Sequence, residues 1–287
     1  MKNISFILLL SIALSSCLSS VSNKIVKQER MTKKEKALAI LNRAWLTHGM
    51  DQMSKKKVYE VIATNHWKGI QGKFGKLWPN QKQLMKLQYA VGTFDSKVTF
   101  LNGKKQGEER GLQAWKYYVK EKGDSVLEFK KKTHRKTQFG LAAFHYFFEL
   151  LDRLKKVDLI AYAGEKTFNG NQYELVFITW EKLEKHPEHD QYVLWINKKT
   201  NMMDYVHFTV HDTPFPGNMV TGSVEFTQFK TIEGVKIPFE QIVYVGDPKA
   251  NQNKYLHKLT VNDFKFDAFD KQVLYPKKEL MSIGDSK

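Results

Sequence analysis

Two long series of alternating apolar and polar residues take up most of this chain, and they constrain its fold more than any other feature. Successive side chains of a strand point to opposite faces, so a period of two predicts strands. Gly, Asn and Asp punctuate both series at the spacing of hairpin turns. The expected strands are Val58–Trp67, Leu84–Phe94, Lys97–Lys105, Leu112–Val119 and Ser125–Lys131 in the first series, and Asn171–Trp180, Tyr192–Asn197, Met202–Asp212, Gly222–Ile232, Val235–Val245 and Lys254–Phe266 in the second.

Two segments have helical spacing instead. Residues 33–48 form an amphipathic pattern that ends at Gly49, where a left-handed C-terminal cap is expected. The second segment, Phe139 to Val157, is apolar around most of its circumference, which predicts a helix buried against a sheet. About ten adjacent antiparallel strands rarely stay flat. The predicted fold class is therefore α+β: a large curled antiparallel sheet, an unclosed β-barrel, with apolar helices in its concavity.

The first thirty residues have the order of an export signal. Lys2 precedes the apolar stretch Ile4 to Leu14, which is too short to span a bilayer. The next residues, Leu14-Ser15-Ser16-Cys17, resemble the lipobox of bacterial lipoproteins, in which the cysteine is acylated and the chain is cut before it. An ordinary secretory leader cut after Ser22 is the alternative. We expect a lipoprotein signal peptide at 1–16, lipidation of Cys17, a flexible tether at 17–30 and a single domain at 31–287.

The balance of charge is strongly basic. The formal net charge is +16, and removal of residues 1–16 takes away Lys2 alone and leaves +15. In a cytosolic protein this excess would point to nucleic acid. An exported, lipid-anchored chain meets anionic lipid head groups instead, so we predict a membrane and no nucleic acid as partner. Short scattered lysine runs are equally typical of a solvated surface.

Three stretches carry a resemblance to a known superfamily. They are "YVLWINKKTNMMDYVHFT" from Tyr192, "FTQFKTIEGVKIPFEQIVY" from Phe226 and "VNDFKFDAF" from Val261. Together with the N-terminal helix and the long meander, they resemble the LolA/LolB superfamily of lipoprotein carriers and receptors, over roughly residues 31 to 276. Uncharacterised lipoproteins associated with the outer membrane are similar as well. The resemblance implies a LolA/LolB-like domain without catalysis or a cofactor.

Alternation predicts which side chains face the interior of the curled sheet. The charge of Glu174 places Tyr173, Leu175 and Phe177 on the inner face, and the polar residues Tyr205, His207 and Thr209 leave Val206, Phe208 and Val210 for the same face. The candidate ligand-binding residues are Tyr173, Leu175, Phe177, Trp195, Val206, Phe208, Val210, Phe226 and Phe239. They line either an apolar cavity for acyl chains or a filled core.

Other candidate sites are less specific. Phe215 lies between two prolines, which indicates a tip for membrane or partner contact, or a ring folded over the barrel mouth. Two histidine clusters, at residues 186–190 and 207–212, offer metal donors, but neither spacing fixes a third ligand, so no metal is expected. Motifs for a serine nucleophile, a phosphate loop or a zinc helix are absent from the sequence, so no enzyme is predicted.

The sequence thus predicts a lipid-anchored protein of the bacterial cell envelope, at the outer membrane and facing the periplasm. Its predicted function is non-catalytic binding of a lipid or an acylated protein in an apolar cavity. The alternative is a structural or accessory lipoprotein with a filled core that docks on an envelope complex.

Overall fold

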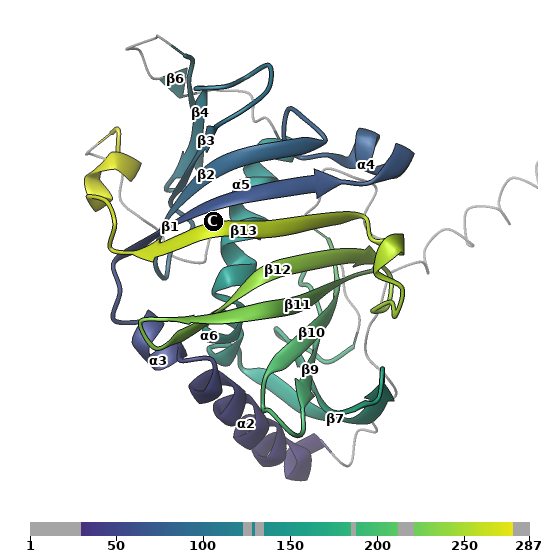
Figure 1. Cartoon of the computed structure of the whole chain (residues 1–287). Coiled ribbons are helices and arrows are strands. Elements are labelled where there is room, and N and C mark those ends of the chain that lie inside the picture. The colour runs from purple at the N-terminus through teal and green to yellow at the C-terminus, as the bar shows by residue number, and fades with distance from the viewer. Residues whose placement is uncertain (1–29, 123–127, 130–134, 185–187, 212–220, 278–287) are drawn as a thin grey trace, which may run out of the picture.

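The computed structural model describes residues 30–122, 128–129, 135–184, 188–211 and 221–277 (Figure 1). Within them the chain forms one 13-stranded antiparallel sheet in the order β6-β5-β4-β3-β2-β1-β13-β12-β11-β10-β9-β8-β7. The strands are β1 Val58–Trp67, β2 Lys82–Ala90, β3 Ser96–Phe100, β4 Glu109–Gln113, β5 Lys116–Lys120, β6 Glu128–Phe129, β7 Leu159–Phe168, β8 Asn171–Thr179, β9 Tyr192–Asn197, β10 Met203–Thr209, β11 Thr221–Ile232, β12 Val235–Val245 and β13 His257–Phe266.

Two features of the strand order shape the sheet. The first strand, β1, pairs with the last, β13, at its centre, in a register that runs from Tyr59 opposite Phe266 to Trp67 opposite His257. Among the described residues the edge strands β6 and β7 are not paired with each other, so the curled sheet stays open. The predicted α+β class with a curled, unclosed antiparallel sheet is confirmed.

The helices are α2 Arg30–Thr47, α3 Met50–Met53, α4 Gly69–Gly75, α5 Arg135–Phe148 and α6 Leu150–Lys155, with short 3₁₀ turns η3 Gln252–Lys254 and η4 Lys271–Leu274. In Figure 1, α5 and α6 run behind the central strands, and α2 lies along the lower edge. Leu141, Phe144 and Phe148 of α5 are buried in the main core together with side chains of the sheet. None of the helices among the described residues is long and apolar enough to cross a membrane.

The apolar segment expected as one helix from Phe139 to Val157 is divided at Glu149, which separates α5 from α6. Glu149 is buried and accepts hydrogen bonds from His145 Nε2 at 2.8 Å, Arg153 Nη2 at 2.7 Å and the backbone N–H of Gly92 at 3.1 Å. Burial alone would raise the pKa of the Glu149 carboxyl, but these three donors outweigh it and lower the pKa. An ionised carboxylate therefore ties the helix pair to the β2–β3 turn.

One other expectation about local structure was wrong, and two elements were not expected. Residues 112–119 are not one strand, because Ala114 (φ 47°) and Trp115 (φ 61°) make a two-residue turn between β4 and β5. Positive φ at both central residues is the geometry of a type I′ hairpin, which usually takes Asn-Gly, so Ala-Trp does not indicate this turn. The strand β7 was not predicted, and α4 was not predicted either.

The helix α2 ends just before Gly49, which has the left-handed conformation that the sequence predicted. Its φ of 71° is left-handed, and a Cβ there would lie 2.0 Å from the carbonyl oxygen of Gly234, so glycine lets the helix end pack directly on the β11–β12 turn. The preceding residue, His48, is buried, and its Nε2 accepts the backbone N–H of Met203 at 2.9 Å. Burial, with a smaller effect from the charge of Lys236, lowers the pKa of His48 to about 3. A neutral imidazole thus joins α2 to β10.

Candidate functional site

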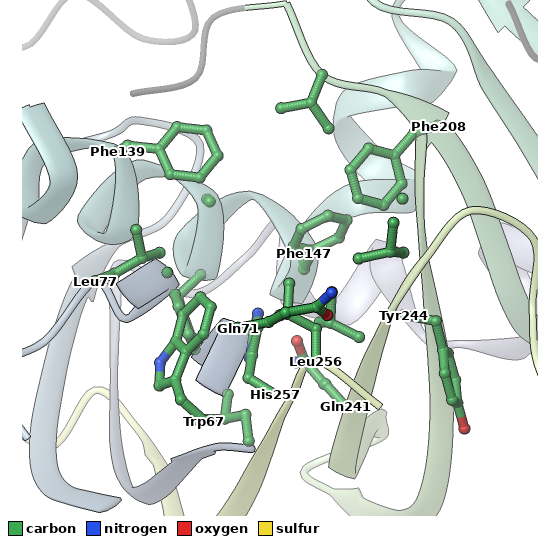
Figure 2. A pocket seen from close by; sticks show the side chains of 18 of the residues that line it. Trp67, Gln71, Leu77, Phe139, Phe147, Phe208, Gln241, Tyr244, Leu256 and His257 are labelled. Atoms are coloured by element: carbon green, nitrogen blue, oxygen red, sulfur yellow. The ribbon is translucent and has the colours of Figure 1, made fainter. Parts of the chain in front are cut away.

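An apolar cavity of about 370 Å³ lies between α5, α4 and the ends of β1, β10, β12 and β13. Figure 2 shows the rings of Phe139 and Phe208 on one side of the cavity and those of Trp67 and His257 on the other. The described residues that line it are Trp67, Gln71, Gly75, Leu77, Phe139, Ala143, Phe144, Phe147, Phe208, Val210, Thr221, Gly222, Gln241, Val243, Tyr244, Val245, Leu256, His257 and Leu259. Neither a carboxylate nor a lysine or arginine side chain is among them.

Two small residues bear on the shape of the cavity. On α5, Phe139, Ala143 and Phe147 are spaced by one helical turn and present one face to the cavity. Ala143 provides little side chain at the middle of this face. Gly222 of β11 also lines the cavity, and a Cβ there would lie 3.1 Å from Phe208 Cζ. Ala143 therefore leaves space between two aromatic rings of α5, and Gly222 lets the Phe208 ring lie close to β11.

His257 gives the cavity a defined hydrogen-bond donor. Asn65 Nδ2 donates to the carbonyl oxygen of Lys258 at 3.0 Å, and since a carbonyl only accepts, this bond fixes the orientation of the Asn65 amide. The same nitrogen lies 3.1 Å from His257 Nδ1, which must therefore accept. Burial lowers the pKa of His257 to about 3, so the ring is neutral and carries its proton on Nε2. Trp67 stacks on the imidazole with the ring centres 4.1 Å apart and holds its plane.

Two further donors in the lining are buried without a partner among the described residues. They are Gln241 Nε2 and Trp67 Nε1, and both side chains are about 3% exposed. An unpaired buried N–H costs about 1 to 3 kcal/mol. Both atoms are buried within the wall of the cavity, so His257 is the donor on which a ligand argument can rest. An apolar site with this donor and no acid suits a ligand that is mostly hydrocarbon and carries an acceptor oxygen.

Comparisons with known proteins bear on the fold. No family model matches the chain, and no curated protein matches its sequence. Among solved structures, it is similar to a DUF1329 family protein from Desulfovibrio piger, with 12% identity, coverage of 87% of this chain and 99% of that one, and a TM-score of 0.53. A putative outer membrane lipoprotein-sorting protein domain from Vibrio parahaemolyticus (13% identity, 84% and 97% covered, TM-score 0.52) and a LolA superfamily protein from Nitrosomonas europaea (12%, 83% and 96%, 0.50) are also similar.

The fold is LolA-like. At sequence identities this low, the structural similarity shows the fold alone. Five predicted ligand-binding residues lie on the concave face of the LolA-like sheet. Phe208 and Val210 line the cavity, with the Phe208 ring 5.3 Å from that of Phe147. Val206, Phe226 and Phe239 are buried in the main core outside it.

The predicted face was wrong for Tyr173, Leu175 and Phe177. With Trp195 they belong to a second apolar cluster, separate from the main core, whereas Val176 and Ile178 of the same strand pack with the helices. The error came from Glu174, whose charge was taken to mark the outer face. Glu174 instead lies on the α2 side, where Arg43 Nη2 pairs with its carboxylate at 2.8 Å. Contact of these four residues with the cavity is therefore not expected.

Several lining residues of the LolA-like cavity were not singled out by the sequence reasoning. Phe139, Ala143 and Phe147 belong to the helix that was expected in the concavity, so only their role was missed. Trp67 and His257 stand at the facing ends of the paired strands β1 and β13. Their pairing joins residues 190 positions apart, and no short-range pattern in the sequence reveals it.

The remaining predicted sites are at the N-terminus, in one loop and at the histidines. Cys17 and Phe215 lie outside the described residues, as does His186. The donor atoms of Glu181, Glu188 and His189 lie within 4.8 Å of one another, but both glutamates are exposed, as is common at surfaces without a metal. Both ring nitrogens of His207 have partners, Thr221 Oγ1 at 3.0 Å and Asp247 Oδ1 at 3.1 Å.

Proposed function

We propose that this protein is a lipid-anchored, non-catalytic protein of the bacterial envelope that holds an acyl chain of a lipid or an acylated protein in the cavity beside α5. The observation that carries the proposal is the uncharged cavity of about 370 Å³ inside a LolA-like sheet. Ligand sites of proteins typically have such volumes and apolar linings. The cavity argues against the alternative of an accessory protein with a filled core.

The volume bears on the ligand. At about 370 Å³ the cavity lies near the lower end of the range of ligand pockets, and its lining is apolar, so it suits a single acyl chain. The second and third chains of a phospholipid or lipoprotein would lie outside it. The Nε2–H of His257 would donate to an ester or carboxyl oxygen of the bound chain.

The ligand is tested with a protein that begins at Lys24 and is purified from a bacterial envelope. The described helices, strands and core lie within residues 30–277, so this protein keeps all of them. Native mass spectrometry is expected to show an added mass of a fatty acid or phospholipid, released on unfolding. A bare polypeptide mass, together with no uptake of a fluorescent fatty acid, would favour the accessory protein.

A pair of variants locates the ligand. Ala143→Phe places a ring in the middle of the cavity and is expected to reduce fatty-acid uptake at least tenfold. Leu46→Phe adds the same ring on α2, at a residue that is 61% exposed, and is expected to leave uptake unchanged. If both variants bind like the wild type, the chain is held elsewhere.

The anchor is tested separately in cells. Growth with an alkyne fatty acid is expected to label the full chain, and Cys17→Ser is expected to abolish the label. A labelled Cys17→Ser variant would exclude Cys17 as the acylated residue. Fractionation of the labelled protein with the outer membrane is expected from the proposed location.

A further inference from the structure

The short helix α4 turns two of its three glycines, Gly72 and Gly75, toward the protein and its large apolar side chains away from it. A Cβ at Gly72 would lie 2.6 Å from the backbone carbon of Trp67, and one at Gly75 would lie 3.6 Å from the Trp67 ring. On the outer side, Ile70 and Phe74 are 77% and 71% exposed. This orientation is the opposite of the usual one, because a helix that packs on a sheet normally buries its large apolar side chains.

The exposed apolar side chains stand at the rim of the cavity. Gln71 and Gly75 of α4 line it, so Ile70 and Phe74 are their immediate neighbours on the same helix. Val245, at the end of β12, also lines the cavity and is 49% exposed. Figure 1 shows α4 beyond the end of β1, where it projects from the sheet. The rim is thus an apolar surface continuous with the lining of the cavity.

The charged side chains on α4 and next to it are all basic. Lys68, Lys73 and Lys76 flank the apolar residues of α4, and none of them forms an ion pair among the described residues. Lys68 Nζ donates to the backbone oxygen of Asn253, and Lys76 Nζ donates to that of Lys73. The sequence contains no Asp or Glu between Glu60 and Asp95. Peripheral helices bind anionic bilayers through exposed apolar side chains that are flanked by basic residues.

We propose that α4 docks this protein on an anionic lipid bilayer, with Ile70 and Phe74 inserted at the level of the head groups and Lys68, Lys73 and Lys76 on lipid phosphates. In this orientation the rim of the cavity faces the membrane. It is independent of the N-terminal anchor and goes beyond the proposed function, because a protein can hold an acyl chain without docking in this way.

The test uses the protein that begins at Lys24 and vesicles of 3:1 phosphatidylethanolamine and phosphatidylglycerol. Cosedimentation at low salt is expected for the wild type, with weak binding to pure phosphatidylcholine. The double variant Ile70→Ser/Phe74→Ser is expected to bind at least tenfold more weakly, since two apolar side chains no longer enter the bilayer. Lys73→Gln/Lys76→Gln is expected to lose about 30-fold, which corresponds to two basic residues at an anionic surface.

Matched controls separate docking from net charge and from general surface apolarity. Lys116→Gln/Lys199→Gln removes the same two charges from exposed positions elsewhere, and Leu46→Ser removes an exposed apolar residue of α2. Both are expected to bind the vesicles like the wild type. Absence of wild-type binding, or equal losses in the controls, would overturn the proposal.

A separate measurement keeps the two proposals apart. Uptake of a fluorescent fatty acid from solution, without vesicles, is expected to be unchanged in the α4 double variants. Vesicle binding with no uptake of the fatty acid would refute the proposed function and leave docking standing, and the reverse result would refute docking alone.

Discussion

Acid should destabilise this protein through two buried neutral histidines, His48 and His257. Burial lowers both pKa values to about 3, from 6.5 in an exposed imidazole. Between these values the unfolded chain binds more protons than the folded one, so the free energy of unfolding falls as the pH falls. Each histidine is expected to lower it by about 2 kcal/mol between pH 7.5 and pH 5.0, and both together by about 4 kcal/mol. This is a large part of the 5 to about 15 kcal/mol of a typical domain.

Urea denaturation at pH 7.5, 6.0 and 5.0, followed by tryptophan fluorescence, measures this change. In His48→Gln the amide oxygen can still accept the N–H of Met203, but the side chain does not titrate, so the loss on acidification should shrink by about 2 kcal/mol. His257→Asn, which keeps an acceptor for Asn65, should reduce the loss of unfolding free energy on acidification by a similar amount. Burial also lowers the pKa of His145, which acts in the same direction in all variants. A pH dependence equal to the wild type in both variants would refute the assignment.

Three further variants test the core, the α2 cap and the cavity. Glu149→Gln removes the carboxylate that pairs with buried Arg153 and is expected to cost about 3 to 5 kcal/mol in urea denaturation. Gly49→Ala, whose Cβ would meet the carbonyl of Gly234, is expected to cost at least about 3 kcal/mol, against about 1 kcal/mol for Gly170→Ala, which has the same sign of φ and open space around it. His257→Asn is expected to weaken fatty-acid binding about fivefold, the loss of one hydrogen bond, as measured by fluorescence titration, whereas unchanged affinity would mean that Nε2 does not contact the ligand.

The sequence predicted the sheet well where one face of a strand is clearly polar. In β10, Tyr205 and His207 alternate with Val206 and Phe208, and the latter two face the helices as expected. In β8 both faces are apolar, so a single charge decided the assignment. That charge, Glu174, has its partner on α2 rather than in solvent, and a partner 131 residues away cannot be inferred from local alternation.

The site was harder to predict than the fold. A cavity is the difference between the space that the strands and helices enclose and the volume of the side chains that fill it. Here a small residue, Ala143, stands between Phe139 and Phe147 on the face of α5 that lines the cavity. Nothing in the sequence distinguishes this alanine. The helix α4 was missed because three glycines in seven residues indicate a loop. In the structure, Gly72 and Gly75 permit close packing of the helix on Trp67.

The pairing of β1 with β13 also has a consequence for how the chain is made. The central pair of the sheet joins the first strand to the last, with His257 to Phe266 opposite residues 59 to 67. During folding β1 therefore has one unpaired edge until residues 257–266 can pair with it, and closure of so long a loop slows folding. An exposed central strand invites misassembly with other chains. A chaperone that holds the incomplete chain should thus matter more for this protein than for one whose neighbouring strands are all consecutive.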